Sequence, residues 1–357
     1  RQCQNVNYYL MEKPLTVCIP TNRDLNHSKQ SIFSAISFSE NNQSQLIISD
    51  NSKDKNKKKI LQDIDLPFLK YVSDGPEIAI ENWFNAVKNS QSEYTMILSD
   101  DDLIFNIQDE KIDYKELKNN NILGIKPIIS CWNREAGIYK NNDFNIEEND
   151  PLERMISYRK KSSGDNTTMY SFYDTSILKD LLMVFMHHPT RGGYTDWAFM
   201  QALVSSGKIL NDTSKLVVYK NKNWFGDKKY IEDQEKKLFS NCGLSDRGYL
   251  FSMVFRAIDV FILVLRQSSP IKRLLLIQSA KEALLFYLEL FLSLYDKNTN
   301  LFLEKEREVI NKINLDNNIE EILENILEIV TIFDEKLKKK YEEFYYKSID
   351  CDCVAIK

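Results

Sequence analysis

The sequence predicts an α/β fold, in which a mostly parallel sheet is flanked by helices and followed by an all-helical C-terminal region. Up to about residue 225, short β-rich runs alternate with amphipathic windows of helical period. From about residue 231 the strand signals fade and helical periodicity takes over. The chain has 357 residues, 43% of them hydrophobic, so it can bury a core in one large domain and a smaller one.

The first part of the chain is expected to alternate strand and helix. We expect strands at residues 15–19, 45–49, 68–73 and 94–99, and helices between them at 27–40, 57–64 and 77–90. This alternation is typical of βαβ units, whose strands pair in parallel.

The remainder of this domain is less regular. We expect strands at residues 122–130, 167–178 and 214–221, a loop over 133–150, and a helix over 195–207 that stops at Gly207. These elements complete a predicted α/β domain over residues 1–228.

Residues 229–357 form the predicted helical domain, with helices at 247–267, 270–295 and 319–347. Pro270 is suited to the first turn of the second helix, and the third carries an apolar stripe. We expect these helices to pack on the α/β domain, with a second copy of the chain or a lipid surface as alternatives. No run reaches the ~18 apolar residues of a membrane span, and the N-terminus lacks a signal-peptide stretch.

The overall charge gives no reason to expect a nucleic-acid partner, because 47 Lys and Arg face 52 Asp and Glu for a net charge of −5. The lysine-rich run at 52–59 is most simply a solvated loop and helix start, with phosphate binding as the alternative. Six cysteines without zinc or redox spacing indicate a reducing, cytoplasmic setting.

Polar segments follow three of the expected strands: "PTNRD" (20–24), "DNS" (50–52) and "SDDD" (99–102). Each alone is explained by a turn or a helix cap. Parallel α/β sheets bind ligands beyond the carboxyl ends of their strands, however, and all three segments fall there. Together they predict one polar site.

The strings "LTVCIPTNRD", "LIISDNS", "NWFNAV" and "YTMILSDDD" resemble the nucleotide-sugar-binding half of an inverting family-2 glycosyltransferase with a GT-A (Rossmann-like) fold, of the bacterial surface-glycan type. The resemblance is strong over residues 14–105 and looser over 120–225. It implies that the residues lining the donor are Pro20, Thr21, Arg23, Asp50, Asn51, Asn82, Asp100 and Asp101. Among these, Asp50 corresponds to the residue that binds the base.

The resemblance also implies a divalent cation, Mn²⁺ or Mg²⁺, held by the D-x-D element Asp100 and Asp102. We expect Asp102 on the metal, with Asp100 and Asp101 on the sugar or ribose side. Such ions take hard oxygen ligands and stabilise the charge of a departing diphosphate. Relatives often add a His from the loop after the last strand; here Asn221, Asn223, Asp227 or water are the candidates.

An inverting transfer needs a general base, and the resemblance points to Asp196 in "TRGGYTDWAFMQAL". Thr195 stands where a Glu is common. A helix N-terminus keeps such a carboxylate ionised and lowers its basicity; the alternative is that Thr195 or Asp196 merely caps the helix. Arg191 and Trp224 are candidate acceptor or flap residues. For Trp224 the reason is that aromatic rings stack on sugars, and an ordinary core contact is the alternative.

Two adjacent histidines, His187 and His188, precede this loop. Adjacent side chains on a strand point to opposite faces. We therefore expect them to shape an acceptor pocket rather than to bind a metal together.

The predicted function is a metal-dependent inverting glycosyltransferase. It would move a sugar from a nucleotide-diphosphate donor, most often a UDP-sugar in this family, to a hydroxyl of a glycan or lipid-linked glycan for a capsule, lipopolysaccharide or teichoic acid. The setting is cytoplasmic, with peripheral association at the inner face of the membrane and homo-oligomerisation as open alternatives. Two other functions compete: a nucleotidyltransferase, although "PTNRDLNHSK" lacks its glycine-rich loop, and a non-catalytic sugar-nucleotide-binding assembly module.

Overall fold

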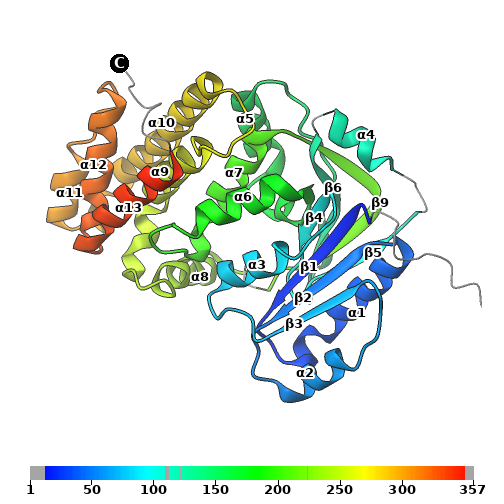
Figure 1. The fold of residues 1–357 in the computed structure, drawn as a ribbon. Coiled ribbons are helices and arrows are strands. Elements are labelled where there is room, and N and C mark those ends of the chain that lie inside the picture. Colours follow the sequence, from blue (N-terminus) through cyan, green and yellow to red (C-terminus); the bar gives the residue numbers. More distant parts are fainter. Residues whose placement is uncertain (1–12, 109–111, 121, 223, 350–357) are drawn as a thin grey trace, which may run out of the picture.

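The computed structural model describes residues 13–108, 112–120, 122–222 and 224–349. It contains a sheet of parallel and antiparallel strands that is flanked by helices, and a helical C-terminal region, so the predicted α/β fold class is confirmed (Figure 1). The strands follow the order β3-β2-β1-β4-β8-β6-β9-β5, and β7 pairs with β6. Their bounds are β1 (Leu15–Thr21), β2 (Gln45–Asp50), β3 (Leu69–Ser73), β4 (Tyr94–Ile97), β5 (Leu103–Asn106), β6 (Ile122–Asn133), β7 (Gly137–Asn142), β8 (Phe172–Asp174) and β9 (Lys208–Lys220).

One half of the sheet is parallel. β1 lies between β2 and β4 and pairs in parallel with both, and β3 continues the parallel pairing beyond β2. In the other half β8 runs antiparallel to β4 and β6, β5 runs antiparallel to β9, and β6 and β9 are parallel. The carboxyl ends of β1, β2 and β4 therefore meet at one edge.

Helices cover both faces of the parallel half. Val17 and Ile19 in β1 are buried in one apolar cluster with Phe38 of α1, whereas Cys18 is buried in the other cluster with Val87 of α3. This is the period of two expected of a strand covered on both sides. The helices of this part are α1 (Leu25–Asn41), α2 (Lys55–Gln62), α3 (Ala79–Val87), α4 (Tyr114–Asn119), α5 (Pro151–Ser162), α6 (Thr175–Phe185) and α7 (Asp196–Ser206). Two 3-10 turns belong to the same part, η1 (Thr167–Tyr170) and η2 (Gly193–Thr195).

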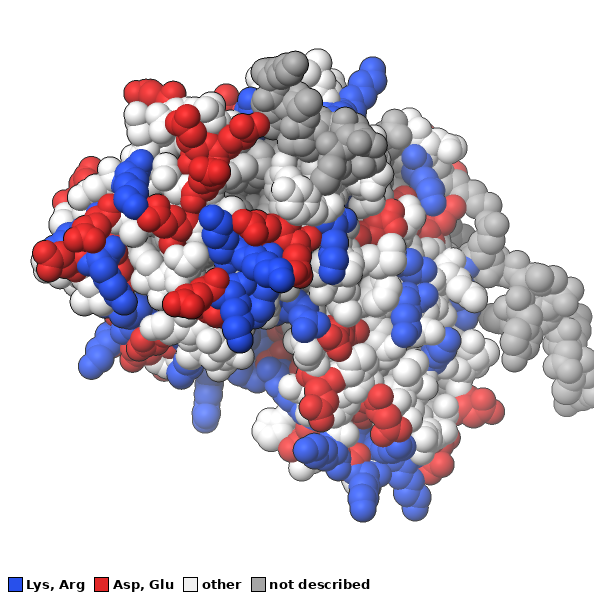
Figure 2. Space-filling view, turned by 60° about the vertical axis from the view of Figure 1, so that its left-hand side comes forward, with Lys and Arg blue, Asp and Glu red and all other residues white. Residues whose placement is uncertain are grey.

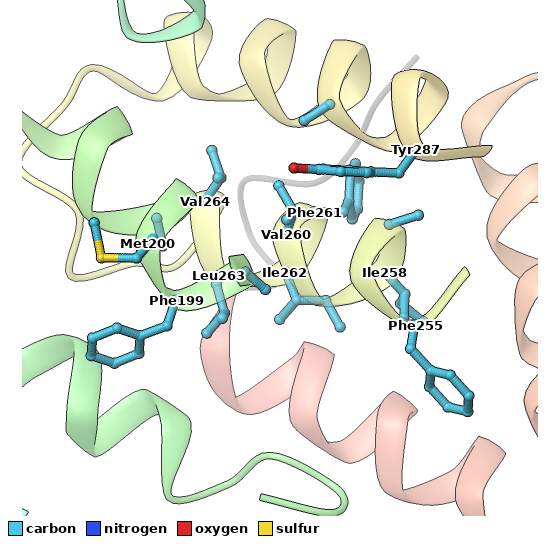
Figure 3. Packing of buried hydrophobic residues seen from close by; sticks show 14 of the residues in the cluster. Phe199, Met200, Phe255, Ile258, Val260, Phe261, Ile262, Leu263, Val264 and Tyr287 are labelled. Carbon is cyan, nitrogen blue, oxygen red and sulfur yellow. The ribbon is translucent and has the colours of Figure 1, made fainter. Parts of the chain in front are cut away.

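The C-terminal helices share a core with the α/β part. Phe199 and Met200 of α7 belong to the same apolar cluster as the α9 residues, α7 lies beside α9, and Tyr287 of α10 lies over α9 (Figure 3). Figure 1 shows the last helices gathered at the end of the molecule away from α1 and α2. Their bounds are α8 (Lys228–Ser240), η3 (Asp246–Phe251), α9 (Ser252–Val264), α10 (Arg273–Lys297), η4 (Thr299–Leu301), α11 (Glu304–Ile310), α12 (Ile319–Thr331) and α13 (Glu335–Ser348).

Two buried arginines hold the C-terminal end of α7. Arg154 donates to the carbonyls of Val204 at 2.8 Å and Ser205 at 2.5 Å, and Arg266 donates to Ser206 Oγ at 2.6 Å. Cations at a helix C-terminus satisfy its free carbonyls and interact favourably with its dipole. The direction of α7, and thus the place of its first residue, is fixed by these contacts.

The strand expected at 167–178 is wrong outside β8. Asp174 ends β8, and its Oδ1 accepts from the backbone N–H groups of Ser176 at 2.9 Å and Ile177 at 3.2 Å, which starts α6. Asp before Thr and Ser is a helix N-cap signal, and it outweighs the β-formers that surround it.

Other expected bounds also change. The loop at 133–150 contains β7, which forms a hairpin with β6 because Asn133 Oδ1 accepts from two N–H groups of the turn and Gly137 has φ +68°. The single helix expected at 319–347 is two helices, since Asp334 caps α13. Pro270 lies before α10, which begins at Arg273.

The surface around the C-terminal helices carries charges of both signs side by side (Figure 2). On α10, Leu276, Leu284 and Leu288 face the core, while Leu274 is 79% exposed. Among the described residues, no helix combines the length and apolar character needed to cross a membrane. Cys18, Cys131 and Cys242 are free thiols, and the other three cysteines lie outside the described residues.

Candidate active site

The three polar segments predicted from the sequence lie together at the carboxyl edge of the parallel strands. Thr21 at the end of β1 is in register with Asp50 at the end of β2. The backbone N–H of Leu98, just after β4, donates to Cys18 O in β1 at 2.8 Å, which brings the three following aspartates beside Thr21. The topology thus delivers residues some 80 positions apart to one place.

Asp50 is buried and accepts three hydrogen bonds. Its Oδ1 accepts from the Ser52 N–H at 2.9 Å and from Lys57 Nζ at 3.3 Å, and its Oδ2 accepts from the Tyr71 hydroxyl at 2.9 Å. Burial and this hydrogen bond raise the pKa of Tyr71, so the phenol keeps its proton and donates. The carboxylate is held in a single orientation.

Lys57 is a site residue that sequence reasoning missed. It lies in the run expected to be a solvated loop and helix start, but its side chain is fully buried on α2. Its Nζ donates to Thr21 Oγ1 at 2.7 Å and to Arg23 O at 2.8 Å in addition to Asp50. Burial lowers the pKa of the ammonium group, and the charge of Asp50 acts in the opposite direction. The signal available was its helical phase, since Leu61 one turn later is buried too.

Thr21 and Arg23 continue the network to the aspartates. Thr21 donates to Asp100 Oδ2 at 2.6 Å. Nη1 of Arg23 lies 2.7 Å from Asp100 Oδ1 and 2.8 Å from Asp101 Oδ2, and Lys222 Nζ lies 3.1 Å from the same Asp101 oxygen. Burial alone would raise the pKa of Asp101, but Arg23 and Lys222 outweigh it and the pKa lies below its usual value.

Asp102 has a different environment from its two neighbours. It is 1% exposed, and its Oδ1 accepts from the backbone N–H of Lys220 at 2.7 Å, which ties β9 to the end of β4. Burial raises its pKa to about 7, against a hydrogen bond from Tyr170. The Tyr170 hydroxyl also lies 2.9 Å from Ser99 Oγ. Neighbouring carboxyls with pKa values moved apart are common at functional sites.

The donor chemistry of these aspartates suits a hard divalent cation, but not an all-protein cage. In the described residues no three His, Cys, Asp or Glu side chains are arranged to hold a metal ion. Mg²⁺ commonly takes one or two carboxylates and completes its shell with phosphate oxygens and water, and the strand end offers this. Asp100 and Asp101 form ion pairs with Arg23 and Lys222, whose side chains are 41% and 58% exposed. A metal bound at these carboxylates would displace the two side chains. Placement of the metal on Asp102 and Asp100 stays a prediction.

Asn82, expected to face the donor, is 3% exposed, and its side-chain amide hydrogen-bonds to β2. Its Oδ1 accepts from Ser49 Oγ at 2.5 Å and its Nδ2 donates to Ser49 O at 3.0 Å. It therefore positions the residue before Asp50. Asn51 similarly donates its side-chain amide to Pro76 O.

Pro20 sits in β1 just past the last β1–β4 pair, Cys18 and Ile97. A proline is tolerated there because that side of the strand needs no further N–H donor.

Asp196, the candidate base, is half-buried at the first position of α7. Thr195 does not cap the helix, because its Oγ1 donates to Gly192 O at 2.7 Å, whereas Asp196 Oδ1 accepts from the backbone N–H of Trp197 in the first turn at 2.7 Å. Burial raises the pKa of the Asp196 carboxyl, although Arg256 and the amide of Asn166 act in the opposite direction. The expected lowering of basicity by the helix N-terminus is therefore outweighed by burial.

The segment around the 3-10 turn η1 contacts both carboxyl centres. Asn166, just before it, contacts Asp196, and Tyr170 at its end contacts Asp102. Asn166 and Tyr170 are four positions apart in the chain, so one short segment contacts both Asp196 and Asp102.

The candidate acceptor residues lie in two loops. Arg191 forms an ion pair with Glu81 on α3. Trp224, 39% exposed, donates its backbone N–H to Asn221 Oδ1 at 2.9 Å, and Asn221 Nδ2 donates to the Tyr139 hydroxyl at 2.6 Å.

Two of the three residues proposed as a further metal ligand are described, and both use their side chains in other hydrogen bonds. The side chain of Asn221 is used in the contacts above. Asp227 caps α8 by accepting from the Tyr230 N–H at 2.8 Å. Asn223 lies outside the described residues.

The two histidines do not line an open pocket together. His187 is exposed, and His188 is buried with its Nε2 2.9 Å from Asp259 Oδ1 on α9. The expected pocket role of the pair is wrong for His188, because the chain turns at the end of α6 and directs this ring into the helical core.

The sequence matches no family model and no curated protein. Among solved structures, the chain is similar to a crystal structure of S. aureus TarS residues 1–349, with a TM-score of 0.48 and 13% identity over 93% of this chain and 88% of that one. The same fragment in complex with UDP-GlcNAc gives a TM-score of 0.46 and 13% identity over 93% and 89% of the two chains. A longer TarS structure gives 0.47 and 13%, over 93% of this chain and 54% of that one.

Proposed function

We propose that this protein is a metal-dependent inverting glycosyltransferase of the family-2, GT-A type, using a nucleotide-diphosphate sugar as donor. One observation carries the proposal: a continuous polar network runs from Asp50 through Lys57 and Thr21 to Asp100 and Arg23. It crosses the carboxyl ends of β2, β1 and β4, where parallel α/β sheets bind nucleotides.

The network offers complementary groups along its length for the parts of such a donor. Asp50 and Tyr71 stand at the β2 end, with a carboxylate and a phenol for the base. The exposed Arg23 guanidinium stands at the β4 end, where a diphosphate would gain a bidentate partner. A divalent cation bound at Asp102 and Asp100 would supply additional stabilisation for the charge of the leaving diphosphate.

Arg23 has two roles in this proposal. Before donor binding it neutralises Asp100 and Asp101. When the diphosphate binds, its guanidinium turns from the carboxylates to the phosphate oxygens, and the aspartates become free for the cation. Both states keep every charge paired, which low-dielectric sites require.

Asp196 is the proposed general base. In an inverting transfer the acceptor hydroxyl attacks the anomeric carbon from the face opposite the diphosphate; one C–O bond forms as the other breaks, and the hydroxyl proton passes to the base. The raised pKa of Asp196 suits this role, because proton transfer is most efficient when the pKa of the base approaches the operating pH.

The proposed acceptor is a glycan or lipid-linked glycan of a bacterial surface polysaccharide. An exposed aromatic group near the end of β9 supports a sugar-binding surface: the rings of Tyr139 and Phe225 lie 5.3 Å apart, and Trp224 is beside them in the chain. Aromatic faces stack on the apolar faces of sugar rings. The proposed place of action is the cytoplasm, at the inner face of the membrane where lipid-linked acceptors are extended.

A thermal-shift screen of nucleotide sugars with and without Mn²⁺ tests the proposal. A donor that binds the native state raises the melting temperature, and we expect the largest rise with a UDP-sugar plus Mn²⁺. Transfer or slow donor hydrolysis should then require the metal and be lost in Asp102→Ala. No shift with any nucleotide sugar would contradict the proposal, and pyrophosphate release from a nucleoside triphosphate would indicate a nucleotidyltransferase instead.

A further inference from the structure

His188 sits in a cage of aromatic rings between α6 and the C-terminal helices. Its imidazole stacks on Phe185, with ring centroids 5.0 Å apart and an interplanar angle of 13°, and meets the edges of Tyr194, Tyr341 and Phe344. Its side chain has no exposed surface. The ring therefore has one available orientation.

The hydrogen bonds of His188 fix its tautomer. Nδ1 accepts from the backbone N–H groups of Arg191 at 3.0 Å and Thr190 at 3.3 Å. A backbone N–H can only donate, so Nδ1 carries no proton and Nε2 must. Nε2 then donates to Asp259 Oδ1 at 2.9 Å, and the Tyr341 hydroxyl donates to the same oxygen at 2.9 Å.

The segment held by Nδ1 is the loop 189–195 that leads to the candidate base. Within it Thr190 Oγ1 lies 2.8 Å from the Tyr194 hydroxyl. The Tyr194 ring stacks on Phe239 at 4.4 Å between centroids. A Cβ added at Gly192 would lie 2.8 Å from Cys242 Sγ, so α8 and its following turn press directly on the loop.

The same loop also reaches the donor half of the site. Arg191 adopts a left-handed φ of +52°, which is costly for a residue with a Cβ and must be held by its surroundings. Its guanidinium pairs with Glu81 on α3. Glu81 precedes Asn82, the residue that holds Ser49 before Asp50. Arg191 thus links the base loop to the donor network.

We propose that His188, Asp259 and Tyr341 are positioning residues that set the loop 189–195, and through it Arg191 and Asp196, for transfer. The C-terminal helices are then part of the active site: α9 supplies Asp259 and α13 supplies Tyr341. For its catalytic consequence this inference rests on the proposed function.

Stability alone does not account for the network. Asp259 is fully buried, and within the described residues its Oδ2 has no hydrogen-bond partner. A buried carboxylate that is only partly satisfied is costly, and apolar residues of similar volume are often at least as stable. The carboxylate fixes the tautomer of His188: it accepts from the Nε2 proton, and Nδ1 is therefore free to accept from the N–H groups of the loop.

The test compares Tyr341→Phe with the matched control Tyr346→Phe on the same helix, whose tyrosine is 63% exposed. Two readouts are measured: amide hydrogen exchange of the 189–195 segment without substrate, and transfer kinetics with the donor found by the thermal-shift screen. In Tyr341→Phe we expect faster exchange confined to this loop and kcat lowered about five- to tenfold with nucleotide affinity unchanged, because small misplacements of reacting groups are costly. Tyr346→Phe should match the wild type in both.

A second pair of variants separates the two nitrogens of His188. The amide of His188→Asn reaches the position of Nδ1 and can still accept from the Arg191 N–H, whereas the amide of His188→Gln reaches toward Asp259. We expect His188→Asn to keep the slower loop exchange and more of kcat than His188→Gln.

The outcomes distinguish this inference from the proposed function. Loop exchange and kcat in Tyr341→Phe equal to those of Tyr346→Phe would overturn the inference. Exchange that rises equally across all of the chain would also overturn it, since that would mean a purely structural role. Faster exchange confined to the loop, in a protein that shows no transfer with any donor even as wild type, would keep the positioning of the loop and reject the glycosyltransferase.

Discussion

Nη1 of Arg23 lies 2.7 Å from Oδ1 of Asp100. The same atom lies 2.8 Å from Asp101, and Lys222 approaches Asp101 from the other side. Three consecutive carboxyls at a strand end repel one another unless something compensates. In this structure two cations of the chain relieve the repulsion for Asp100 and Asp101, and burial favours the protonated form of Asp102. A divalent cation that binds Asp100 would therefore compete with Arg23.

Arg23→Gln should bind Mn²⁺ more tightly than the wild type when no nucleotide is present. Removing one positive charge near the ion is worth on the order of 1 kcal/mol even in a water-like dielectric, which corresponds to about a five- to tenfold lower Kd for the metal. The melting temperature, measured against Mn²⁺ concentration, reports this. Transfer should fall at the same time, because the diphosphate loses its guanidinium partner.

Lys58→Gln is the control for Arg23→Gln. It makes the same change of charge at an exposed lysine that pairs with Asp74, and it should leave the metal response unaltered. If Arg23→Gln responds to Mn²⁺ just as Lys58→Gln does, then Arg23 does not compete for the metal site.

Lys57→Met should lower the free energy of unfolding by about 3–5 kcal/mol, the usual cost of removing one partner of a buried ion pair. Both Lys57 and Asp50 are almost fully buried, and the substitution leaves the Asp50 carboxylate with only Ser52 and Tyr71 as partners. Urea denaturation measures the loss. Adding Asp50→Asn should recover part of it, and Lys58→Met should change little. A loss below about 1 kcal/mol would show that the pair is already solvated.

Gly75→Ala should weaken nucleotide binding and stability together. The added Cβ would lie 2.6 Å from Asn82 Oδ1 and 3.0 Å from Ser49 Oγ. These two groups are hydrogen-bonded to each other, and Ser49 directly precedes Asp50. Overpacking of this kind costs about 1–3 kcal/mol. The cost should be smaller in an Asn82→Ala background, since the clashing oxygen is gone; equal costs in both backgrounds would mean that the strain lies elsewhere.

The sequence predicts the parallel half of the fold and its polar edge well for a local reason. Apolar runs such as 15–19 and 45–49 are bounded directly by Thr21 and Asp50, so strand and strand end are both visible in a few residues. Here the prediction depends only on neighbours in sequence, and it holds.

Two of the misses depend on distant contacts, and a third, at 167–178, is local. Lys57 resembles any solvated lysine until α2 folds back over Thr21 and Asp50. Tyr170 gains a role only when η1 crosses the ends of β4 and β9. The 167–178 segment is rich in β-formers, yet one cap at Asp174 starts a helix there.

Asp196→Asn should lower kcat about 10²- to 10⁴-fold, the range for loss of a general base, with unchanged affinity for the nucleotide. The carboxylate is the active form, and burial raises the pKa of Asp196. The acid limb of the wild-type pH–rate profile should therefore lie above the pKa of an ordinary aspartate. Transfer rates and nucleotide Kd across this pH range, measured for both proteins, check this.

The same substitution should stabilise the protein at neutral pH. Because the folded state holds the Asp196 proton more tightly than the unfolded state, the free energy of unfolding falls as pH rises from the ordinary aspartate pKa to the raised one. Asparagine carries no such proton, so Asp196→Asn should melt higher than the wild type above that range and lose this advantage in acid. Asp227→Asn, at an exposed helix cap, should show no such gain. A variant that is less stable at neutral pH and still fully active would make Asp196 a structural carboxylate, and the base would have to be sought elsewhere.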